Sequence, residues 1–253
     1  MRVSLAGRIA LVTGGGVGIG QAIALALAEA GATIAVTYRS HTPNSDFTAQ
    51  VEAITGRPPV TLQLDATSET EITNAAETLR RQFGAVDLLV NNVGGLVERS
   101  ELKNMPYALW REVMGVNLDS LFLVTHHILP LMTNPQGRII NVASLAARNG
   151  GHPGAVAYAS AKAAMFGFTR GLARELASDG ITVNALAPGF IEETPFHQTF
   201  TTEESKKATI RSIPVGRAGV PDDVASAAVW LAGPDTSFVT GAIIDINGGQ
   251  YFG

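Results

Sequence analysis

Tyr158 and Lys162 stand four positions apart at the start of a helical pattern, and both side chains can move a proton. Residues four apart share one helix face, so the phenol and the ammonium can point into the same site. At an effective dielectric near 20, a cation about 4 Å from the phenol is worth roughly 4 kcal/mol and lowers its pKa by about two to three pH units. We therefore expect Tyr158 to exchange a proton near neutral pH. The alternative is a tyrosine–lysine pair on a solvated helix face.

Ser144 follows a buried-strand pattern at 138–142. Ligands of doubly wound sheets bind at the carboxyl ends of the strands, so this hydroxyl could hold a substrate oxygen on which charge develops. The simpler interpretation is a serine that caps a turn.

A glycine-rich turn with Gly14, Gly18 and Gly20 joins an apolar run at 9–12 to a helical pattern at 21–30. Glycines let the backbone approach a pyrophosphate, and the free N–H groups at a helix start favour negative charge. The sequence therefore predicts a phosphate-binding turn. A merely tight strand-to-helix turn is the alternative.

Short apolar runs alternate with helical patterns along the whole chain. The runs lie at 9–12, 33–36, 60–64, 87–90, 138–142, 182–186 and 242–246, and helical patterns include 21–30, 69–83, 106–131, 158–177 and 221–231. This alternation predicts an α/β fold with a doubly wound parallel sheet of about seven strands and helices on both faces. We expect a single domain over residues 1–253, with a substrate loop at about 188–217 that includes a short helix.

The composition favours small-molecule partners. The chain has 253 residues, 46% hydrophobic content, a net charge of -4 and no cysteine. This balance gives no broad attraction to nucleic acid or anionic membranes, and no apolar run approaches the roughly 20 residues of a membrane helix. The adjacent His126 and His127 diverge by about 100° on a helix and cannot share one metal. The sequence contains no HExxH motif, no Cys/His cluster and no carboxylate pair at metal spacing, so we expect no catalytic metal. The default location is the cytoplasm.

Together these pieces resemble the short-chain dehydrogenase/reductase family over nearly the whole chain. The residues that carry the resemblance are the Thr13-to-Gly20 turn, Asp65, Asn91, Asn92, Val93, Gly94, Asn117, Ser144, Tyr158, Lys162, Pro188 and Gly189. The resemblance implies a Rossmann-type sheet and makes Tyr158 the general acid or base. It implies that Ser144 orients the substrate oxygen, Lys162 lowers the tyrosine pKa and holds the nicotinamide ribose, and Asn117 supports a water-linked proton relay.

The resemblance also implies a set of cofactor contacts. These are Gly14, Gly16, Val17, Gly18, Ile19, Gly20, Tyr38, Arg39, Ser40, Asp65, Ala66, Asn92, Gly94, Tyr158, Lys162, Pro188, Gly189 and Ile191. Asp65 and Asn92 would contact the adenine side, and residues 188–191 the nicotinamide. For Asn92 and Asn117, support of the backbone is the alternative role.

The end of the second strand bears on the choice of cofactor. An acid about 20 positions beyond the glycine turn is typical of NAD enzymes, but here the strand ends in Tyr38, Arg39 and Ser40. The Arg39 guanidinium can pair with a 2′-phosphate. We therefore expect NADP(H) to be preferred and NAD(H) to be possible, although Val17 stands where NADP-preferring relatives often carry a basic residue.

Two segments depart from the family pattern. Ser144 and Tyr158 are one residue further apart than is typical, so the loop 145–157, including Arg148, Asn149 and His152, receives no role. Thr194 lies one position later than the family's nicotinamide-contacting threonine, and Glu193 takes its place. Phe190, Phe196 and Phe200 are candidates for a substrate lid or for loop anchors.

The predicted function is NADP(H)-dependent interconversion of a ketone or aldehyde and an alcohol on a small substrate, with reduction as the favoured direction. The nearest resemblance, at 181–192, is to 3-oxoacyl-carrier-protein reductases, which receive an acidic carrier and call for basic residues at the site mouth. The segment 131–137 lacks such residues. The sequence therefore favours a free ketone, sugar or oxo-ester, with the carrier-linked substrate as the alternative.

The reaction and the assembly are less closely defined by these residues. A catalytically idle dinucleotide-binding or sensor protein, and a lyase or epimerase on the same fold, remain open. A homotetramer is expected through the helices at 106–131 and 158–177 and the C-terminal segment, because those helices carry apolar residues on more than one face.

Overall fold

Within residues 3–194 and 203–253, which the computed structural model describes, seven parallel strands form one sheet in the order β3-β2-β1-β4-β5-β6-β7. The strands are β1 Ile9–Val12, β2 Thr33–Tyr38, β3 Val60–Gln63, β4 Leu88–Asn91, β5 Arg138–Val142, β6 Thr182–Pro188 and β7 Ile243–Ile246. Each predicted apolar run corresponds to one strand, and the expected fold class is confirmed. The chain order reverses between β1 and β4, so a crevice opens at the carboxyl ends of these two strands.

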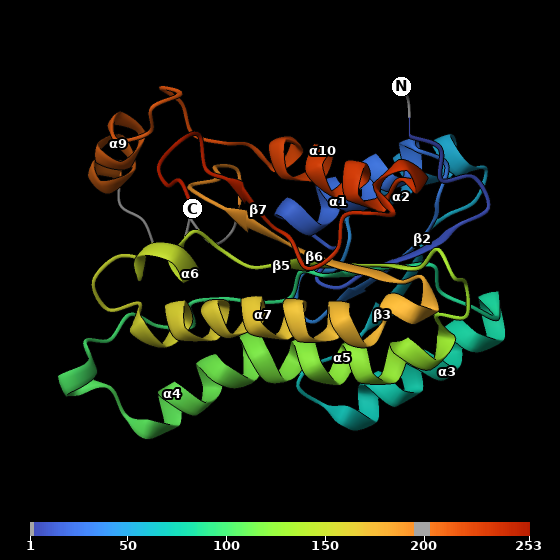
Figure 1. The fold of residues 1–253 in the computed structure, drawn as a ribbon, viewed down its shortest axis with the longest axis horizontal. Helices are drawn as coiled ribbons and strands as arrows, with labels where there is room; N and C mark the ends of the chain where they lie inside the picture. The colour runs from blue at the N-terminus through green and yellow to red at the C-terminus, as the bar shows by residue number, and fades with distance from the viewer. Residues whose placement is uncertain (1–2, 195–202) are drawn as a thin grey trace.

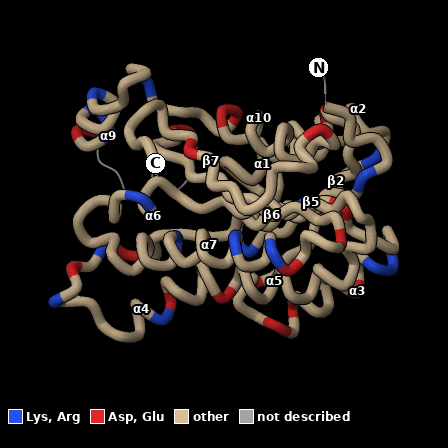
Figure 2. Tube along the Cα trace, in the orientation of Figure 1, with Lys and Arg blue, Asp and Glu red and all other residues tan. Residues whose placement is uncertain are grey.

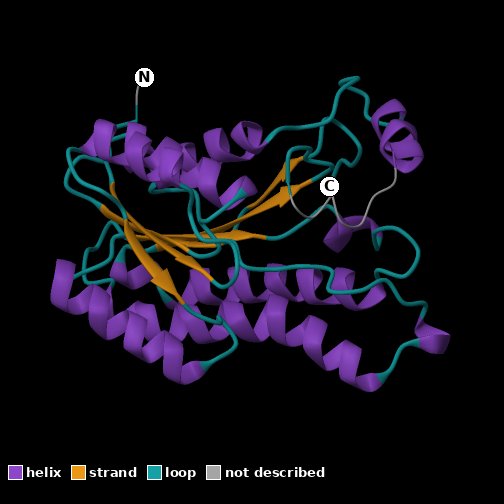
Figure 3. Cartoon of the chain, turned by 180° about the vertical axis from the view of Figure 1, so that it is seen from behind, coloured by secondary structure: helices purple, strands orange, loops and turns teal. Residues whose placement is uncertain are grey.

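Helices cover both faces of the sheet (Figures 1 and 3). One layer contains α1 Gly18–Glu29, α2 Ser45–Thr55 and α10 Pro221–Ala232, and the other contains α3 Glu69–Phe83, α4 Tyr107–Met114, α5 Ser120–Ile128 and α7 Val156–Glu175. Two further helices, α6 Ala146–Asn149 and α9 Glu203–Arg211, lie at the end of the molecule that holds the C-terminus. No helix in the described part of the chain is both long and apolar enough to cross a membrane.

Successive residues of a strand pack into two separate hydrophobic cores, one on each face of the sheet. In β1, Ala10 and Val12 pack with Ile23 of α1, whereas Leu11 packs on the opposite face with Ile72 of α3. A strand that is buried on both faces cannot alternate apolar and polar residues, which explains the continuous apolar runs in the sequence. The sheet is therefore fixed from both sides, and its carboxyl edge is a rigid base for a site.

The pattern at 106–131 is not one helix, contrary to the expectation from sequence. The α4 helix ends at Met114, and a π turn spans Gly115–Asp119, in which the Ser120 N–H donates to the Gly115 carbonyl five residues back. The α5 helix follows, and a 3-10 turn at Leu129–Leu131 ends the segment. Such π turns add one residue to a helix and are frequent at functional sites.

The α2 helix had no counterpart among the predicted helical patterns. Only Phe47 and Val51 of its residues are buried, so its apolar periodicity is short. Its ends carry clear signals, because the Asn44 side chain accepts from the Phe47 N–H and Gly56 closes the helix at φ 76°.

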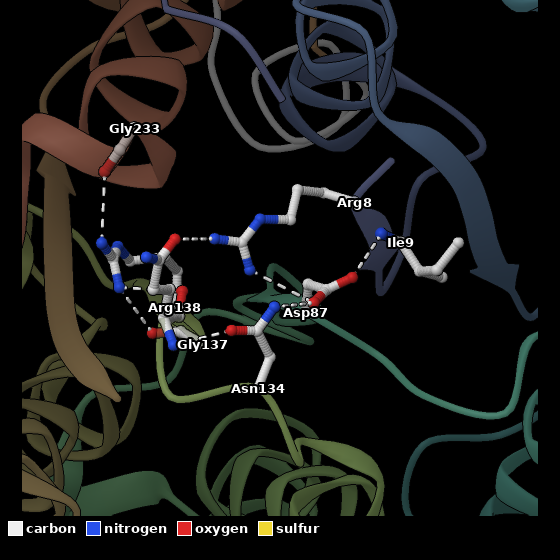
Figure 4. A network of polar contacts seen from close by, with 8 residues as sticks. Arg8, Ile9, Asp87, Asn134, Gly137, Arg138 and Gly233 are labelled. Atoms are coloured by element: carbon white, nitrogen blue, oxygen red, sulfur yellow. Dashed lines mark hydrogen bonds and ion pairs between the residues drawn. The ribbon is translucent and has the colours of Figure 1, made fainter. Parts of the chain in front are cut away.

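A polar network ties the amino ends of β1, β4 and β5 (Figure 4). Asp87 accepts from Arg8 Nη1 at 3.2 Å, from the Ile9 N–H at 2.8 Å and from Asn134 Nδ2 at 2.8 Å. Arg138, which is 1% exposed, donates to the carbonyls of Gln136, Gly137 and Gly233. Burial, helped by the Arg8 charge, lowers the pKa of Arg138 from its ordinary value. Most polar groups at this edge are therefore bound to one another, although the buried Nε of Arg138 has no hydrogen-bond partner within the described residues.

Candidate active site

A cleft of about 820 Å³ runs along the carboxyl ends of the strands. Most of the residues that the sequence singled out line it: Gly14, Gly16, Val17, Gly18, Ile19, Tyr38, Arg39, Ser40, Asp65, Ala66, Asn92, Gly94, Ser144, Tyr158, Lys162, Pro188, Gly189 and Ile191. Asn117 and Gly20 are not in the cleft wall but lie behind it. Residues brought together from six different strand ends thus face one cavity.

The glycine turn forms a shallow cradle at the start of α1. A Cβ at position 16 would lie 2.1 Å from the carbonyl oxygen of His41, and a Cβ at position 20 would lie 2.4 Å from that of Gly14. Gly16 therefore lets the backbone of the cleft wall pass close to residue 41. Gly20 allows close packing of the turn and does not line the cleft. No side chain caps α1 and no acid stands in its first turn, so its free N–H groups suit a phosphate.

Asn92 braces this cradle from the end of β4. Its Nδ2 donates to the carbonyls of Thr13 at 3.0 Å and Gly14 at 3.2 Å, and the Thr13 hydroxyl accepts from the Asn92 N–H at 2.9 Å. The amide is therefore occupied by the backbone of the turn, which favours the supporting role over an adenine contact. Both roles are compatible with its place in the cleft wall.

Arg39, Ser40 and Asp65 form the polar end of the cleft next to β2 and β3. Arg39 Nη1 lies 3.5 Å from Asp65 Oδ2, but its side chain is 66% exposed. The hydroxyl of Thr67 holds the pKa of Asp65 below its ordinary value, with Arg39 adding to this effect. His41 also lines this end, and the sequence interpretation missed it because no motif includes it.

Ser144 and Tyr158 meet at the other end of the cleft. Their hydroxyls are hydrogen-bonded, and Ser144 Oγ also accepts from the Ala146 N–H at 3.1 Å. Burial raises the pKa of Tyr158 above its ordinary value, and the hydrogen bond with Ser144 only partly opposes this. The expected lowering by Lys162 is wrong for this structure, because burial of the phenol has the largest effect on its pKa and Ser144, not Lys162, supplies the interaction that lowers it.

Lys162 is 3% exposed, and its Nζ donates to the Val142 carbonyl at 2.9 Å. Burial lowers the pKa of this ammonium to about 7. The lysine charge is therefore only partly present near neutral pH, which further weakens its pull on the phenol. A Cβ on Gly94 would lie 2.8 Å from this Nζ, so the loop after β4 passes directly over the lysine.

Asn117 lies in the π turn and is fully buried. Its Oδ1 accepts from the Gly95 N–H at 3.0 Å, and its Nδ2 donates to the carbonyls of Gly95 and Val113, each at 2.8 Å. Both amide protons are thus bound to backbone. The side chain fixes the loop that passes over Lys162, and a proton relay through it stays a prediction.

The loop 145–157 is held by Arg148. Its Nε and Nη2 donate to the two carboxylate oxygens of Asp245 on β7 at 3.2 and 3.1 Å, and its guanidinium stacks on the rings of Phe166 and Tyr251. These partners are distant in sequence, so no local pattern could reveal them. Asn149 and His152 of the same loop line the cleft.

Strained backbone occurs in two loops that contribute residues to the cleft, the loop after β4 and the loop after β6. Val97 has φ 64° and Glu193 has φ 59°, a region that branched or charged side chains rarely adopt. Such a residue costs about 1–3 kcal/mol and is found mainly at functional sites. Thr194 lines the cleft and its hydroxyl donates to the Ile191 carbonyl. Phe190 also lines it, whereas Phe196 and Phe200 lie outside the described residues.

The cradle, the uncapped α1 start and the lysine below Gly94 fit a dinucleotide, whose phosphates need backbone N–H groups and whose ribose needs donors. Across the described residues, no group of three or more His, Asp or Glu side chains is arranged to hold a metal ion.

The chain is similar to known oxidoreductases along its whole length. Residues 15–250 match the family model described as "Enoyl-(Acyl carrier protein) reductase". The chain is 39% identical over 250 residues to a 3-oxoacyl-[acyl-carrier-protein] reductase of Vibrio cholerae, covering 98% of this chain and 99% of the relative.

Solved structures agree with these matches. A short-chain dehydrogenase/reductase from Brucella melitensis, named as a glucose/ribitol dehydrogenase, superposes with a TM-score of 0.92 at 31% identity and 100% coverage of both chains. A dehydrogenase/reductase from Sinorhizobium meliloti has a TM-score of 0.91 at 35% identity, with 99% and 98% coverage. The chain therefore belongs to the short-chain dehydrogenase/reductase family, and it is an oxidoreductase that interconverts a carbonyl and an alcohol with a nicotinamide dinucleotide.

Proposed function

We propose that this chain reduces the 3-oxo group of an acyl thioester to a 3-hydroxy group, with NADPH as the preferred cofactor. The observation that carries the substrate class is the similarity to a 3-oxoacyl-[acyl-carrier-protein] reductase at 39% identity over 98% of the chain. It supports the carrier-linked alternative over the free ketone favoured by the sequence.

The site chemistry is compatible with reduction. NADPH held at the uncapped start of α1 and beside Lys162 would supply the hydride for the carbonyl carbon. The Ser144 and Tyr158 hydroxyls hold the carbonyl oxygen, and the phenol gives it the proton that completes the alcohol. Because burial raises its pKa, Tyr158 is protonated at neutral pH and ready to donate. The phenolate then regains a proton from solvent, so one hydride and one proton have been added.

The absence of basic residues at 131–137 is not an argument against a carrier-linked substrate in this structure. That segment precedes β5 and lies at the amino ends of the strands, whereas the cleft lies at their carboxyl ends. The α9 helix borders the cleft through Ser205 and Thr209, and it carries Lys206, Lys207 and Arg211 beside its acids (Figure 2). These basic residues are candidates for contact with an acidic carrier.

The test is NADPH oxidation by the purified chain with acetoacetyl groups on a small thiol and on an acyl carrier protein. We expect turnover of both thioesters and none of the matching crotonyl thioester, which lacks the 3-oxo group. Turnover of free ketones or sugars alone would instead favour a small free substrate, in line with the sugar and polyol named for the Brucella relative. Cofactor binding without turnover of any carbonyl would favour the idle sensor protein.

NADP(H) preference is proposed from Arg39 and Ser40, which line the β2 end of the cleft. The exposed guanidinium can turn from Asp65 towards a 2′-phosphate, and Gln63 holds the Arg39 carbonyl at 3.1 Å. We expect Arg39→Asp to lower the NADPH/NADH ratio of kcat/KM by about tenfold or more, about 1.4 kcal/mol. An unchanged ratio would reject the assignment.

We also propose a homotetramer that works in the cytoplasm. Apolar side chains on α4 and α5 are exposed, including Tyr107 at 74% and Phe122 at 52%, as is Phe252 in the C-terminal segment at 86%. Such exposure suits helices that pack against other subunits. Light scattering at micromolar concentration should give four times the chain mass, and a monomer would reject the proposal. The cysteine-free sequence supports a reducing compartment.

A further inference from the structure

The basic and acidic side chains that line the cleft fall into two groups. Among the described residues, Arg39, His41 and Asp65 lie at the β2–β3 end, and Arg99, His152 and Lys162 lie at the Tyr158 end. The first group contains an acid next to its arginine, whereas no carboxylate of the described chain lines the second. The reacting end of the cleft is thus the more positive one.

Arg99 is held in place by its backbone. The loop after β4 turns sharply at Val97, which has a positive φ. The Glu98 N–H donates to the Leu96 carbonyl at 2.8 Å and closes this turn. Two residues later, the Ser100 N–H donates to the Gly154 carbonyl at 3.1 Å. A strained turn on one side and a bond to the loop before α7 on the other therefore fix the position of Arg99.

The guanidinium itself is only weakly engaged. Its Nη1 lies 3.4 Å from the Pro153 carbonyl, and within the described ranges no Asp or Glu comes within ion-pair distance of it. The adjacent Glu98 does not line the cleft. A guanidinium has five donors, so most of those on Arg99 face the cleft or solvent.

Arg99 lies at the same end of the cleft as the reacting atoms, against the loop that precedes Tyr158. Val97 packs in one apolar cluster with Ala157 and Tyr158, and two residues span at most about 7 Å. His152, from the loop that Arg99 contacts, lines the same part of the cleft. The rest of a substrate whose carbonyl oxygen lies at Tyr158 can therefore come within reach of Arg99.

We propose that Arg99 selects substrates that carry an anionic group, a carboxylate or a phosphate, on the chain that bears the reacting carbonyl. The guanidinium forms paired bonds with such groups, and His152 provides a further donor. This inference rests on the proposed carbonyl reduction. The anion has two sources, the carboxylate of a free oxo acid and the phosphate of the arm that carries a thioester.

The experiment compares wild type with Arg99→Gln on two substrate pairs that differ in charge. Acetoacetate and ethyl acetoacetate test the carboxylate, and acetoacetyl-4′-phosphopantetheine and acetoacetyl-pantetheine, which differ by one phosphate, test the phosphate. In one pair, we expect the variant to lose about tenfold in kcat/KM on the anionic member and less than about twofold on the neutral one. The pair that responds identifies the source of the anion.

Three controls separate recognition from structure. Arg99→Lys should recover part of the preference for the anionic substrate, because lysine keeps the positive charge but cannot form the paired bonds of a guanidinium. Arg80→Gln, on the exposed surface of α3, removes an arginine without touching the cleft and should leave both members unchanged. NADPH affinity should be the same in Arg99→Gln and wild type, and a tenfold loss there would make Arg99 a cofactor contact and overturn the proposal.

Equal losses on charged and neutral substrates would also overturn it, since they indicate a structural role. If the wild type reduces none of these carbonyls, the proposed function fails by itself. Calorimetric titration of acetoacetate and ethyl acetoacetate into the NADP⁺ complex then tests Arg99 separately. Tighter binding of the anion that disappears in Arg99→Gln would support the proposal, and equal binding would reject it.

Discussion

The two edges of the sheet use polar residues in opposite ways. At the amino edge, Asp87 binds three donors and the buried Arg138 donates to three carbonyls (Figure 4). At the carboxyl edge of the same strands, Ser144, Tyr158 and Lys162 face a cleft of about 820 Å³. The same strands thus carry a closed network at one end and a reactive site at the other.

This contrast separates stability from chemistry. Groups that are engaged in several protein contacts have little bonding capacity left for a ligand, and their removal leaves partners buried and unpaired. Groups that face a cleft keep bonding capacity, and burial shifts their pKa values instead, as it does for Tyr158 and Lys162. Variants at the two edges should therefore fail in different assays.

Tyr158→Phe should have the largest effect on activity. The variant lacks the transferable proton, so its kcat should be lower by about 10²-fold or more. Its NADPH affinity and its free energy of unfolding should stay unchanged. Steady-state rates and fluorescence titration of NADPH measure the two effects. Tyr107→Phe, at an exposed tyrosine of α4, is the matched control. A Tyr158→Phe enzyme with more than about a tenth of the wild-type kcat contradicts the acid role.

Asp87→Ala should show the reverse pattern. Its removal leaves Arg8, Asn134 and the Ile9 N–H without their acceptor, and we expect a loss of about 3–5 kcal/mol in the free energy of unfolding. Urea denaturation measures this loss, with Asp179→Ala at an exposed site as the control. The folded enzyme should keep its kcat. A fall in kcat without a loss of stability would contradict the assignment of the amino edge to stability and the carboxyl edge to catalysis.

Lys162→Met should reveal the cost of burying a charge in the site. With an ordinary pKa near 10.5 and a pKa of about 7 in the folded chain, Lys162 binds more protons unfolded than folded between these values. Wild-type stability should therefore rise with pH through this window, by at most about 1.4 kcal/mol per pH unit from this group.

The variant lacks this dependence. The stability difference between wild type and Lys162→Met should shift in favour of the wild type as the pH rises from 7 to about 9. Denaturation curves at several pH values measure it. Parallel stability profiles for the two proteins would show that burial does not lower the lysine pKa.

The smallest effect is expected at Arg148, which is structural although it lies at the carboxyl edge. Loss of its bonds to Asp245 in Arg148→Met should cost about 1–2 kcal/mol and raise KM for the substrate, because the loop after Ser144 is less well held. A double-mutant cycle with Asp245→Asn isolates the pair. A coupling energy near zero would mean that other contacts hold this loop.

The sequence predicts the sheet well because its strands are buried on both faces. Local signals also place the cradle, Ser144 and the Tyr158–Lys162 pair at strand or helix ends, and the structure brings them to one cleft. The π turn was missed, since no residue type marks it. The direction of the Tyr158 pKa shift was missed because burial depends on the whole fold.

Contacts between distant segments were beyond the sequence as well. Arg148 and Asp245 are 97 positions apart, and Arg99 meets the loop before α7 across 54 positions. Neither pair lies in a motif or shares a helix face. The positive φ of Val97 was equally hidden, because a valine disfavours this conformation and only surrounding contacts impose it.

The π turn makes the position of Asn117 depend on a count of residues. Each helical residue turns the chain by about 100°, so deletion of one residue within Gly115–Asp119 would rotate α4 by that angle relative to α5. Leu109 and Val113 before the turn pack with Ala157, and Val124 and Ile128 after it pack in another core cluster, so this rotation would take one pair out of its contacts. Deletion of a single residue there would thus be more damaging than most substitutions, because the number of residues in this segment sets the direction of the Asn117 side chain.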